Sequence, residues 1–167
     1  MPGIQKSSLP HGALHASYAR EGAYTDCYST LIPRPVTHAE YINAFYTTWL
    51  FKLERWVLSW AVNKPSTDEQ ARQLANGEIT NFAAWSLELR SPDQLLMCDF
   101  QGHTRSWLMV APASPGVTRL YFGSVVTSRL NPQTGKRELG RGYRALMGFH
   151  KLYSRALLRA ARGRLLR

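Results

Sequence analysis

The side chains best suited to acid–base chemistry gather around one predicted hairpin of the chain. Asp99, His103 and Arg105 lie in one short segment, and Glu88 and Arg90 precede them on a neighbouring predicted strand. A histidine and a carboxylate can act as a general acid–base pair, and an arginine can stabilise a developing negative charge. Solvated hairpin ends also carry such residues as cross-strand ion pairs. The position beside a turn favours this second interpretation.

His150 is a separate candidate for ligand-binding or acid–base chemistry. It follows Phe149 at the edge of the apolar side of a predicted helix. There an imidazole could bind a polar ligand group or titrate near neutral pH. The alternative is a hydrogen-bonded histidine at the boundary of the core, which is the commoner case.

No set of residues predicts a metal or a cofactor. Among the five histidines, His11 and His15 are four residues apart but lie in or near a predicted loop and not on a helix, and neither Cys27 nor Cys98 belongs to a CxxC or Cys/His motif. Gly140 and Gly142 form a GxG that lacks the preceding strand of a dinucleotide site. We therefore expect no bound metal or cofactor, and two reduced thiols typical of a cytoplasmic protein.

The last part of the chain is strongly basic. Residues 136–167 contain ten Lys or Arg and one acidic residue, which is most of the net charge of +10. At 100° per residue, the cations of the predicted terminal helix share one face, and its apolar residues share the opposite face. The basic face comprises Arg144, Lys151, Arg155, Arg159 and Arg162. It is interpreted first as a solvated face and second as a surface for an anionic partner, either nucleic acid or a membrane surface.

Apolar periodicity and turn signals predict the order of the elements. A helix over 37–61 begins with a Thr37–Glu40 capping box, and a shorter helix begins at Ser66 and ends before Gly77. Aromatic and aliphatic residues cover about half of the first helix, which predicts deep burial or a groove. Strands are predicted over 23–32, 82–90, 95–100, 103–111 and 117–130. The terminal helix begins near Leu139.

Length and composition predict one domain. Residues 20–167 suffice for a sizeable core, and residues 1–19 are expected to form a loosely ordered leader. No run of about 18 apolar residues predicts a membrane span. The order of elements is therefore α+β: one strand, two inserted helices, an antiparallel meander and a long terminal helix.

This order resembles the START-like, or polyketide-cyclase-like, helix-grip superfamily, and within it a family of small uncharacterised bacterial domains. The segments that carry the resemblance are WLFKLERWVLSW, LYFGSVVTSRL and FHKLYSRALLRAA. The resemblance implies a curved antiparallel sheet around a long C-terminal helix, with a cavity between them. It implies no reaction, because the family has no assigned activity.

Three classes of function follow from this resemblance and from the residues. The leading hypothesis is a domain that binds an apolar or amphipathic small molecule between the sheet and the C-terminal helix. Its expected pocket residues are Trp85, Trp107, Tyr121, Phe149, His150 and Tyr153. The second is a cyclase- or dehydratase-type enzyme that uses His103, Asp99 and Arg105. The third is a homodimeric or nucleic-acid-associated module that uses the basic face.

Overall fold

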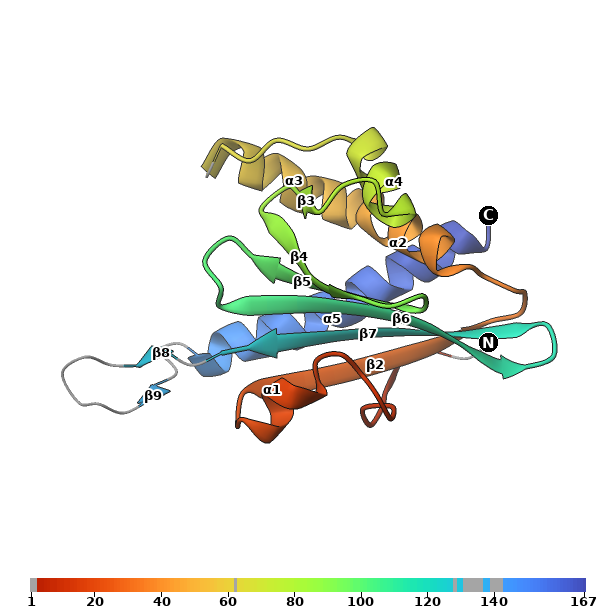
Figure 1. Ribbon diagram of the computed structural model, residues 1–167, viewed down its shortest axis with the longest axis horizontal. Helices are drawn as coiled ribbons and strands as arrows, with labels where there is room; N and C mark the ends of the chain where they lie inside the picture. Colours follow the sequence, from red (N-terminus) through yellow and green to blue (C-terminus); the bar gives the residue numbers. More distant parts are fainter. Residues whose placement is uncertain (1–2, 62, 128, 131–136, 139–142) are drawn as a thin grey trace.

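The computed structural model describes the chain except for residues 1–2, 62, 128, 131–136 and 139–142, and gives no account of the side chains of residues 58, 129–130, 137–138, 143–147 and 149. Within the described part, one curved antiparallel sheet of seven strands has the order β1-β2-β7-β6-β5-β4-β3 (Figure 1). The strands are β1 (Gln5–Lys6), β2 (Tyr24–Ile32), β3 (Asn81–Phe82), β4 (Trp85–Arg90), β5 (Gln94–Asp99), β6 (Thr104–Ser114) and β7 (Val117–Val126). A separate pair of short strands comprises β8 (Arg129–Leu130) and β9 (Arg137–Glu138).

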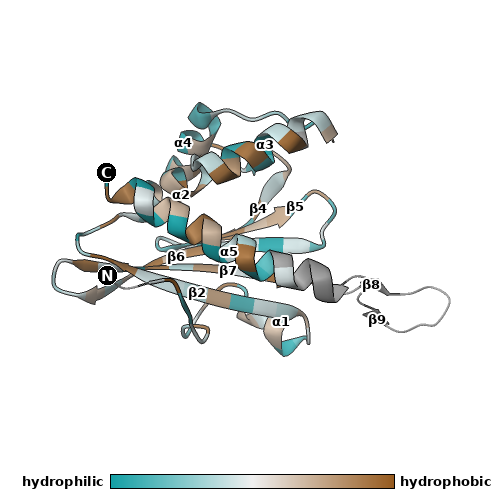
Figure 2. Cartoon of the chain, turned by 180° about the vertical axis from the view of Figure 1, so that it is seen from behind, coloured by the Kyte–Doolittle hydropathy of each residue, from teal (hydrophilic) through white to brown (hydrophobic). Residues whose placement is uncertain are grey.

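The helices after the first α-helix cover one face of the sheet, and the N-terminal segment, which contains that first helix, covers the other. The helices are α1 (Ala16–Arg20), α2 (His38–Tyr46), α3 (Trp49–Ala61), α4 (Asp68–Asn76) and α5 (Tyr143–Leu165). The long α5 crosses behind the sheet, and α2, α3 and α4 lie beside it (Figures 1 and 2). The predicted α+β class, with an antiparallel sheet and a C-terminal helix, is confirmed. Among the described residues, no helix is both long and apolar enough to cross a membrane.

The helix predicted over 37–61 is divided into α2 and α3. Its predicted start is confirmed, since Thr37 and Glu40 form a capping box. The division comes at two threonines whose hydroxyls bond to the backbone. Thr47 Oγ1 donates to the carbonyl of Asn43, and Thr48 Oγ1 accepts from the N–H of Phe51. Such local bonds compete with the backbone hydrogen bonds of a helix. Thr48 is the N-cap residue of α3.

The start of α4 also differs from the prediction by one residue. Thr67 and Gln70 form the capping box that was expected from Ser66. The predicted end is confirmed, because Gly77 has φ of 79°, the left-handed conformation that glycine adopts most readily.

The core has two parts, one on each face of the sheet. The larger part lies between the sheet and helices α2, α4 and α5 and includes Tyr41, Phe45 and Leu158. The smaller part lies on the opposite face and includes Cys27, Leu96 and Trp107. Strands with apolar residues on both faces alternate only weakly between apolar and polar types.

Residues 9–19, within the segment expected as a loosely ordered leader, pack on this second face, whereas Ile4 packs against the helix-covered core. β1 pairs with β2, and the Ser7 N–H donates to the carbonyl of Cys27 at 2.9 Å. Ala13 and His15 are buried, and the His15 ring lies 4.3 Å from that of Trp107 between centroids. This packing covers apolar surface that the sheet would otherwise expose.

Candidate functional site

A cavity of about 480 Å³ lies between the helix-covered face of the sheet and helices α3 and α5. Its volume falls in the range of small-molecule sites, roughly 300–1,000 Å³. Most of its surface is apolar and comes from Phe45, Phe51, Val57, Trp85, Phe122 and Leu157. The wall therefore suits an apolar ligand body, and the few polar groups on it determine what else a ligand can carry.

The first polar group of the cavity is a network of Asp26, Ser124 and His150. The register of β2 against β7 places Asp26 directly opposite Ser124. Asp26 Oδ1 accepts from the Ser124 N–H at 2.8 Å and from the Ser124 hydroxyl at 2.6 Å. His150 reaches this pair from α5, with Nε2 at 2.6 Å from Ser124 Oγ and 3.8 Å from Asp26 Oδ2. Two strands and the terminal helix thus meet at one buried carboxylate.

The direction of these hydrogen bonds follows from the number of protons. Ser124 has one hydroxyl proton, and a carboxylate can only accept, so that proton points to Asp26. Nε2 of His150 must then donate to Ser124 Oγ, which leaves Nδ1 as an acceptor in the neutral ring. Burial lowers the pKa of His150, and the charge of Asp26 opposes that shift. Ser124 is therefore not activated as a nucleophile, since His150 does not accept its proton.

The second polar group is a carboxyl–phenol pair across the cavity wall. The Tyr153 hydroxyl of α5 donates to Glu54 Oε2 of α3. Burial raises the pKa of Glu54, and the hydrogen bond from Tyr153 opposes that shift. Burial also raises the pKa of Tyr153, and the neighbouring Glu54 raises it further. Tyr153 therefore stays a neutral hydrogen-bond donor, and Glu54 holds a proton more readily than an exposed carboxyl group does.

Ser154 supplies a buried hydroxyl that has no hydrogen-bond partner among the described residues. It is 1% exposed, and it lines the cavity one helical turn from His150. Buried polar atoms almost always have a protein, water or ligand partner. An orphaned hydroxyl on an apolar cavity wall therefore indicates where a polar atom of an occupant would bind.

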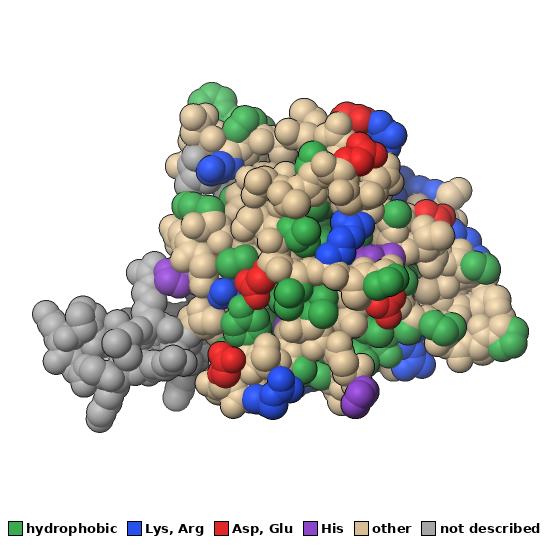
Figure 3. Space-filling model, viewed as in Figure 1, with side chains coloured by type: hydrophobic (Ala, Val, Ile, Leu, Met, Phe, Trp, Pro, Cys, Tyr) green, Lys and Arg blue, Asp and Glu red, His purple; other side chains and the backbone are tan. Residues whose placement is uncertain are grey.

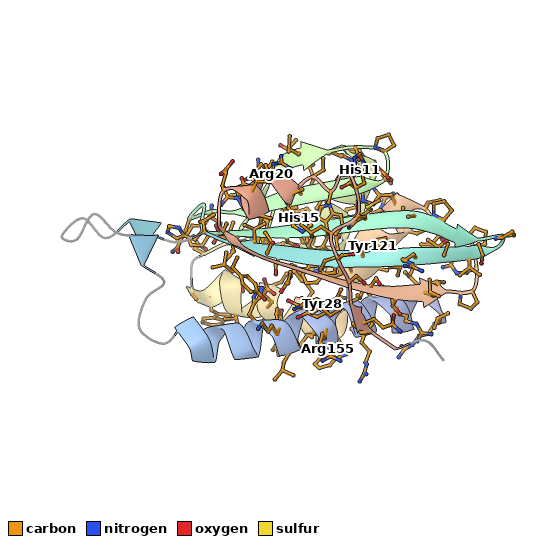
Figure 4. All side chains as sticks on the ribbon, turned by 90° about the horizontal axis from the view of Figure 1, so that it is seen from below. His11, His15, Arg20, Tyr28, Tyr121 and Arg155 are labelled. Atoms are coloured by element: carbon orange, nitrogen blue, oxygen red, sulfur yellow. The ribbon has the colours of Figure 1, made fainter. Side chains whose placement is uncertain are left out.

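Three predicted pocket residues, Trp85, His150 and Tyr153, line this cavity. Two others, Trp107 and Tyr121, do not. Leu108 and Phe122 belong to the helix-covered core, so the residues before them point to the other face. Trp107 is fully buried there and packs near Tyr121, with 6.1 Å between ring centroids. Figure 4 shows Tyr121 on the same side of the sheet as His15, opposite Tyr28 and Arg155.

The residues proposed as an acid–base set are held at the end of a hairpin. Asp99 Oδ1 accepts from the backbone N–H groups of His103 and Thr104, which stabilises the turn. Arg105 borders the cavity, but its guanidinium donates to Glu88 and lies over the Tyr18 ring on the opposite face. The structure therefore does not bring these side chains together inside the cavity. They serve the turn and the second face.

The basic face of α5 is exposed in part. Lys151, Arg155 and Arg159 are exposed, and Figure 4 shows Arg155 pointing away from the sheet. Arg162 is half-buried and donates to the backbone carbonyl of Leu31. The side chains of Arg144 and of the predicted pocket residue Phe149 lie outside the described residues.

Sequence reasoning did not identify Asp26, Ser124, Glu54 or Ser154 as site residues. Asp26 interrupts an otherwise aromatic and β-branched strand, and Glu54 interrupts an aromatic helix face. A charged residue inside an apolar pattern is a signal that each position offered. Nothing in the sequence pairs these positions, because they are far apart in the chain. Among the described residues, no three His, Cys, Asp or Glu side chains lie close enough to hold a metal ion.

Comparisons with known proteins add little to this site. No family model and no curated protein matches the chain. Among solved structures, the chain is similar to CalU16 from Micromonospora echinospora, with 12% sequence identity and a TM-score of 0.30. The match covers 98% of this chain and 92% of that one. At this TM-score the likeness supports no conclusion about fold or function.

Proposed function

We propose that this protein is a helix-grip domain that binds an apolar or amphipathic small molecule between the sheet and α5. The observation that carries the proposal is the orphaned hydroxyl of Ser154 in a mostly apolar cavity. An empty apolar cavity destabilises the fold, and so does a buried hydroxyl without a hydrogen-bond partner. An occupant with one polar atom would fill the cavity and bind the hydroxyl.

The polar groups of the cavity favour a neutral ligand head group. Glu54 and Asp26 would repel an anion, and the Arg105 guanidinium is occupied by Glu88. Neutral His150 offers Nδ1 as an acceptor, and Ser154 offers both a donor and an acceptor. An alcohol, a ketone or a protonated acid on an apolar body meets these requirements. Trp85, His150 and Tyr153 are the proposed binding residues from the original prediction.

The first test is to look for an occupant and then to block the cavity. Native mass spectra of freshly purified protein should show a bound small molecule. Val57 lies at the cavity wall and is 48% exposed, so Val57→Trp should fill the entrance without disturbing the core. Leu89→Trp is the control, because Leu89 is 49% exposed and does not line the cavity.

We expect the bound mass, and binding of the neutral apolar probe N-phenyl-1-naphthylamine, to be lost in Val57→Trp and kept in the control. A wild-type protein without bound mass that also ignores the probe would refute the proposal. Equal probe binding by the two variants would place the probe elsewhere and would also count against it.

A second candidate is an enzyme of the cyclase or dehydratase class. The observation in its favour is that His150 and Glu54, two groups able to exchange protons, line one apolar cavity. They replace His103, Asp99 and Arg105 as the acting groups. If the wild-type protein converts its occupant, His150→Gln and Glu54→Gln should still bind it and leave it unchanged. Conversion at the wild-type rate by both variants would refute this candidate.

A further inference from the structure

Helix α3 carries a line of exposed apolar side chains. Trp49, Trp56 and Trp60 are 72%, 61% and 79% exposed, and Leu53 between them is 51% exposed. The spacing of these four residues places them on one stripe of the helix. Figure 3 shows hydrophobic side chains over the outer end of α3, at the upper left of the view.

This exposure contradicts deep burial of the aromatic helix face along α3, whereas the alternative expectation, a groove, is met at Trp49. The expectation of deep burial holds for α2, where Tyr41, Phe45 and Tyr46 are buried, and fails for α3. Scattered surface apolar residues are normal, but contiguous exposed indoles are typical of a surface that another body covers.

Exposed cations lie next to the tryptophan stripe, on α5. α3 and α5 lie on the same side of the sheet, toward the viewer in Figure 2. A groove between them is lined by Trp49 and Leu152 together with Arg155 and Arg159. Leu152 is 68% exposed, and neither arginine makes an ion pair with any residue that the structure describes. One surface therefore combines unpaired positive charge with exposed indole and leucine side chains.

The cations of α3 itself do not contribute to this surface. Lys52 pairs with Asp68, and Arg55 is buried against Ser66 and Asp68. The tryptophan stripe is thus uncharged, and the positive charge lies along one side of it. This is the arrangement of an amphipathic element that lies in the plane of a membrane interface.

We infer that the α3–α5 face docks on an anionic lipid bilayer. The indole side chain prefers the boundary between lipid head groups and acyl chains, where its ring is apolar and its N–H meets water. Exposed Lys and Arg residues beside it are attracted to acidic head groups. Docking of this kind needs no membrane-spanning helix and does not depend on any occupant of the cavity.

Two other occupants fit the surface less well. In a symmetric dimer through the same face, Arg155 and Arg159 of one copy would approach those of the other and repel them. Nucleic acid would bind the arginines, but it would leave most of the uncharged stripe from Trp49 to Trp60 in water. Both occupants are outcomes of the experiment below.

The test uses the full chain and two kinds of vesicle. One contains equal parts of phosphatidylcholine and phosphatidylglycerol, and the other contains phosphatidylcholine alone. We expect co-sedimentation with the anionic vesicles and a blue shift of tryptophan fluorescence. Binding to neutral vesicles should be weaker, and high salt should weaken binding to the anionic vesicles.

Matched variants separate the surface from the overall charge. Arg155→Gln/Arg159→Gln should reduce partitioning about tenfold or more, since each basic residue contributes to attraction by acidic lipids. Arg20→Gln/Arg119→Gln removes the same charge from exposed positions elsewhere, and should bind much more strongly than the first variant. Trp49→Gln/Trp56→Gln/Trp60→Gln should lose binding, whereas Leu89→Gln/Phe100→Gln, which also removes exposed apolar side chains, should keep it.

Circular dichroism of each variant checks that it is folded, and all substituted side chains are exposed. The inference is overturned if the wild-type protein ignores anionic vesicles, or if both charge variants bind them equally. It is also overturned if the tryptophan variant changes only dimerisation, or if the chain binds a DNA duplex and not the vesicles.

Discussion

The Nε2 atom of His150 lies 2.6 Å from the Oγ atom of Ser124. This contact joins α5 to the middle of the sheet, because Ser124 belongs to β7 and bonds in turn to Asp26 of β2. Asp26 is 4% exposed, and a buried carboxylate requires several donors to offset the loss of hydration. The network therefore fixes where α5 crosses the sheet and places an imidazole on the cavity wall.

The first prediction concerns the charge of Asp26. Asp26→Asn removes the carboxylate that raises the pKa of His150, while the burial that lowers it remains. We expect the pKa of His150, already below 6.5, to fall further, and the free energy of unfolding to fall by about 1–3 kcal/mol because donors lose their charged acceptor. An NMR titration of the imidazole measures the first effect, and urea unfolding measures the second. An unchanged His150 titration would show that the two groups are not coupled.

The second prediction contrasts Trp85 and Trp107, two tryptophans that the sequence predicts in the same pocket. Trp107 is fully buried on the second face and donates to Gln94 Oε1 at 2.9 Å, so Trp107→Phe should cost about 1–3 kcal/mol of stability. It should leave binding of the neutral apolar probe N-phenyl-1-naphthylamine unchanged. Trp85→Phe should weaken that binding, because Trp85 lines the cavity. Probe titrations on both folded variants check the contrast, and the reverse pattern would contradict the location of the site.

Trp107 also shows how far the sequence could predict this site. Alternation along a strand states that Trp107 and Leu108 point to opposite faces, but not which face the helices cover. Both faces of this sheet are apolar, since residues 9–19 cover one of them. The sequence therefore lacks the usual difference between a polar, solvated face and an apolar, buried face. For this reason it does not show that Trp107 and Tyr121 lie on the face opposite the cavity.

The order of elements could be predicted because its signals are local. The Thr37–Glu40 box and Gly77 act within one turn of chain, and both are confirmed. The pairing of Asp26 with Ser124 depends on strand register across 98 positions. The exposure of α3 depends on what packs against it, and an apolar stripe in the sequence does not state what covers it. These parts required the folded chain.

The third prediction concerns the close approach of the N-terminal segment to β7. A Cβ atom on Gly123 would lie 2.7 Å from the backbone oxygen of Asp26 and 2.9 Å from both His15 Nε2 and Trp107 Cε3. Gly123→Ala should therefore destabilise the fold by about 1–3 kcal/mol. Gly163→Ala is the matched control: nothing lies within 4 Å of its added Cβ in α5, so it should stabilise by up to about 1 kcal/mol. Urea unfolding measures the free energy of unfolding of both variants. Equal changes in the two variants would contradict the crowding at Gly123.

The last prediction is a loss of stability in mild acid that arises from two buried histidines. Burial lowers the pKa of both His15 and His38 from 6.5 to about 4. Between those values the unfolded chain binds a proton at each histidine and the folded chain does not, so stability falls as the pH falls. The stabilisation is complete above about pH 6.5 and decreases as the pH approaches 4. Each histidine should cost about 1 kcal/mol by roughly pH 5.5.

Urea unfolding at about pH 7.5 and about pH 5.5 measures this loss, a window in which ordinary carboxyl groups contribute little. His38→Gln should reduce the difference in unfolding free energy between the two pH values by about 1 kcal/mol, whatever its effect on stability at neutral pH. Arg20→Gln, a change at an exposed position on α1, should leave that difference as in the wild-type protein. If His38→Gln retains the full loss, His38 is protonated without cost in the folded chain. Its burial beside Arg90 and Asp93 would then be incorrectly described.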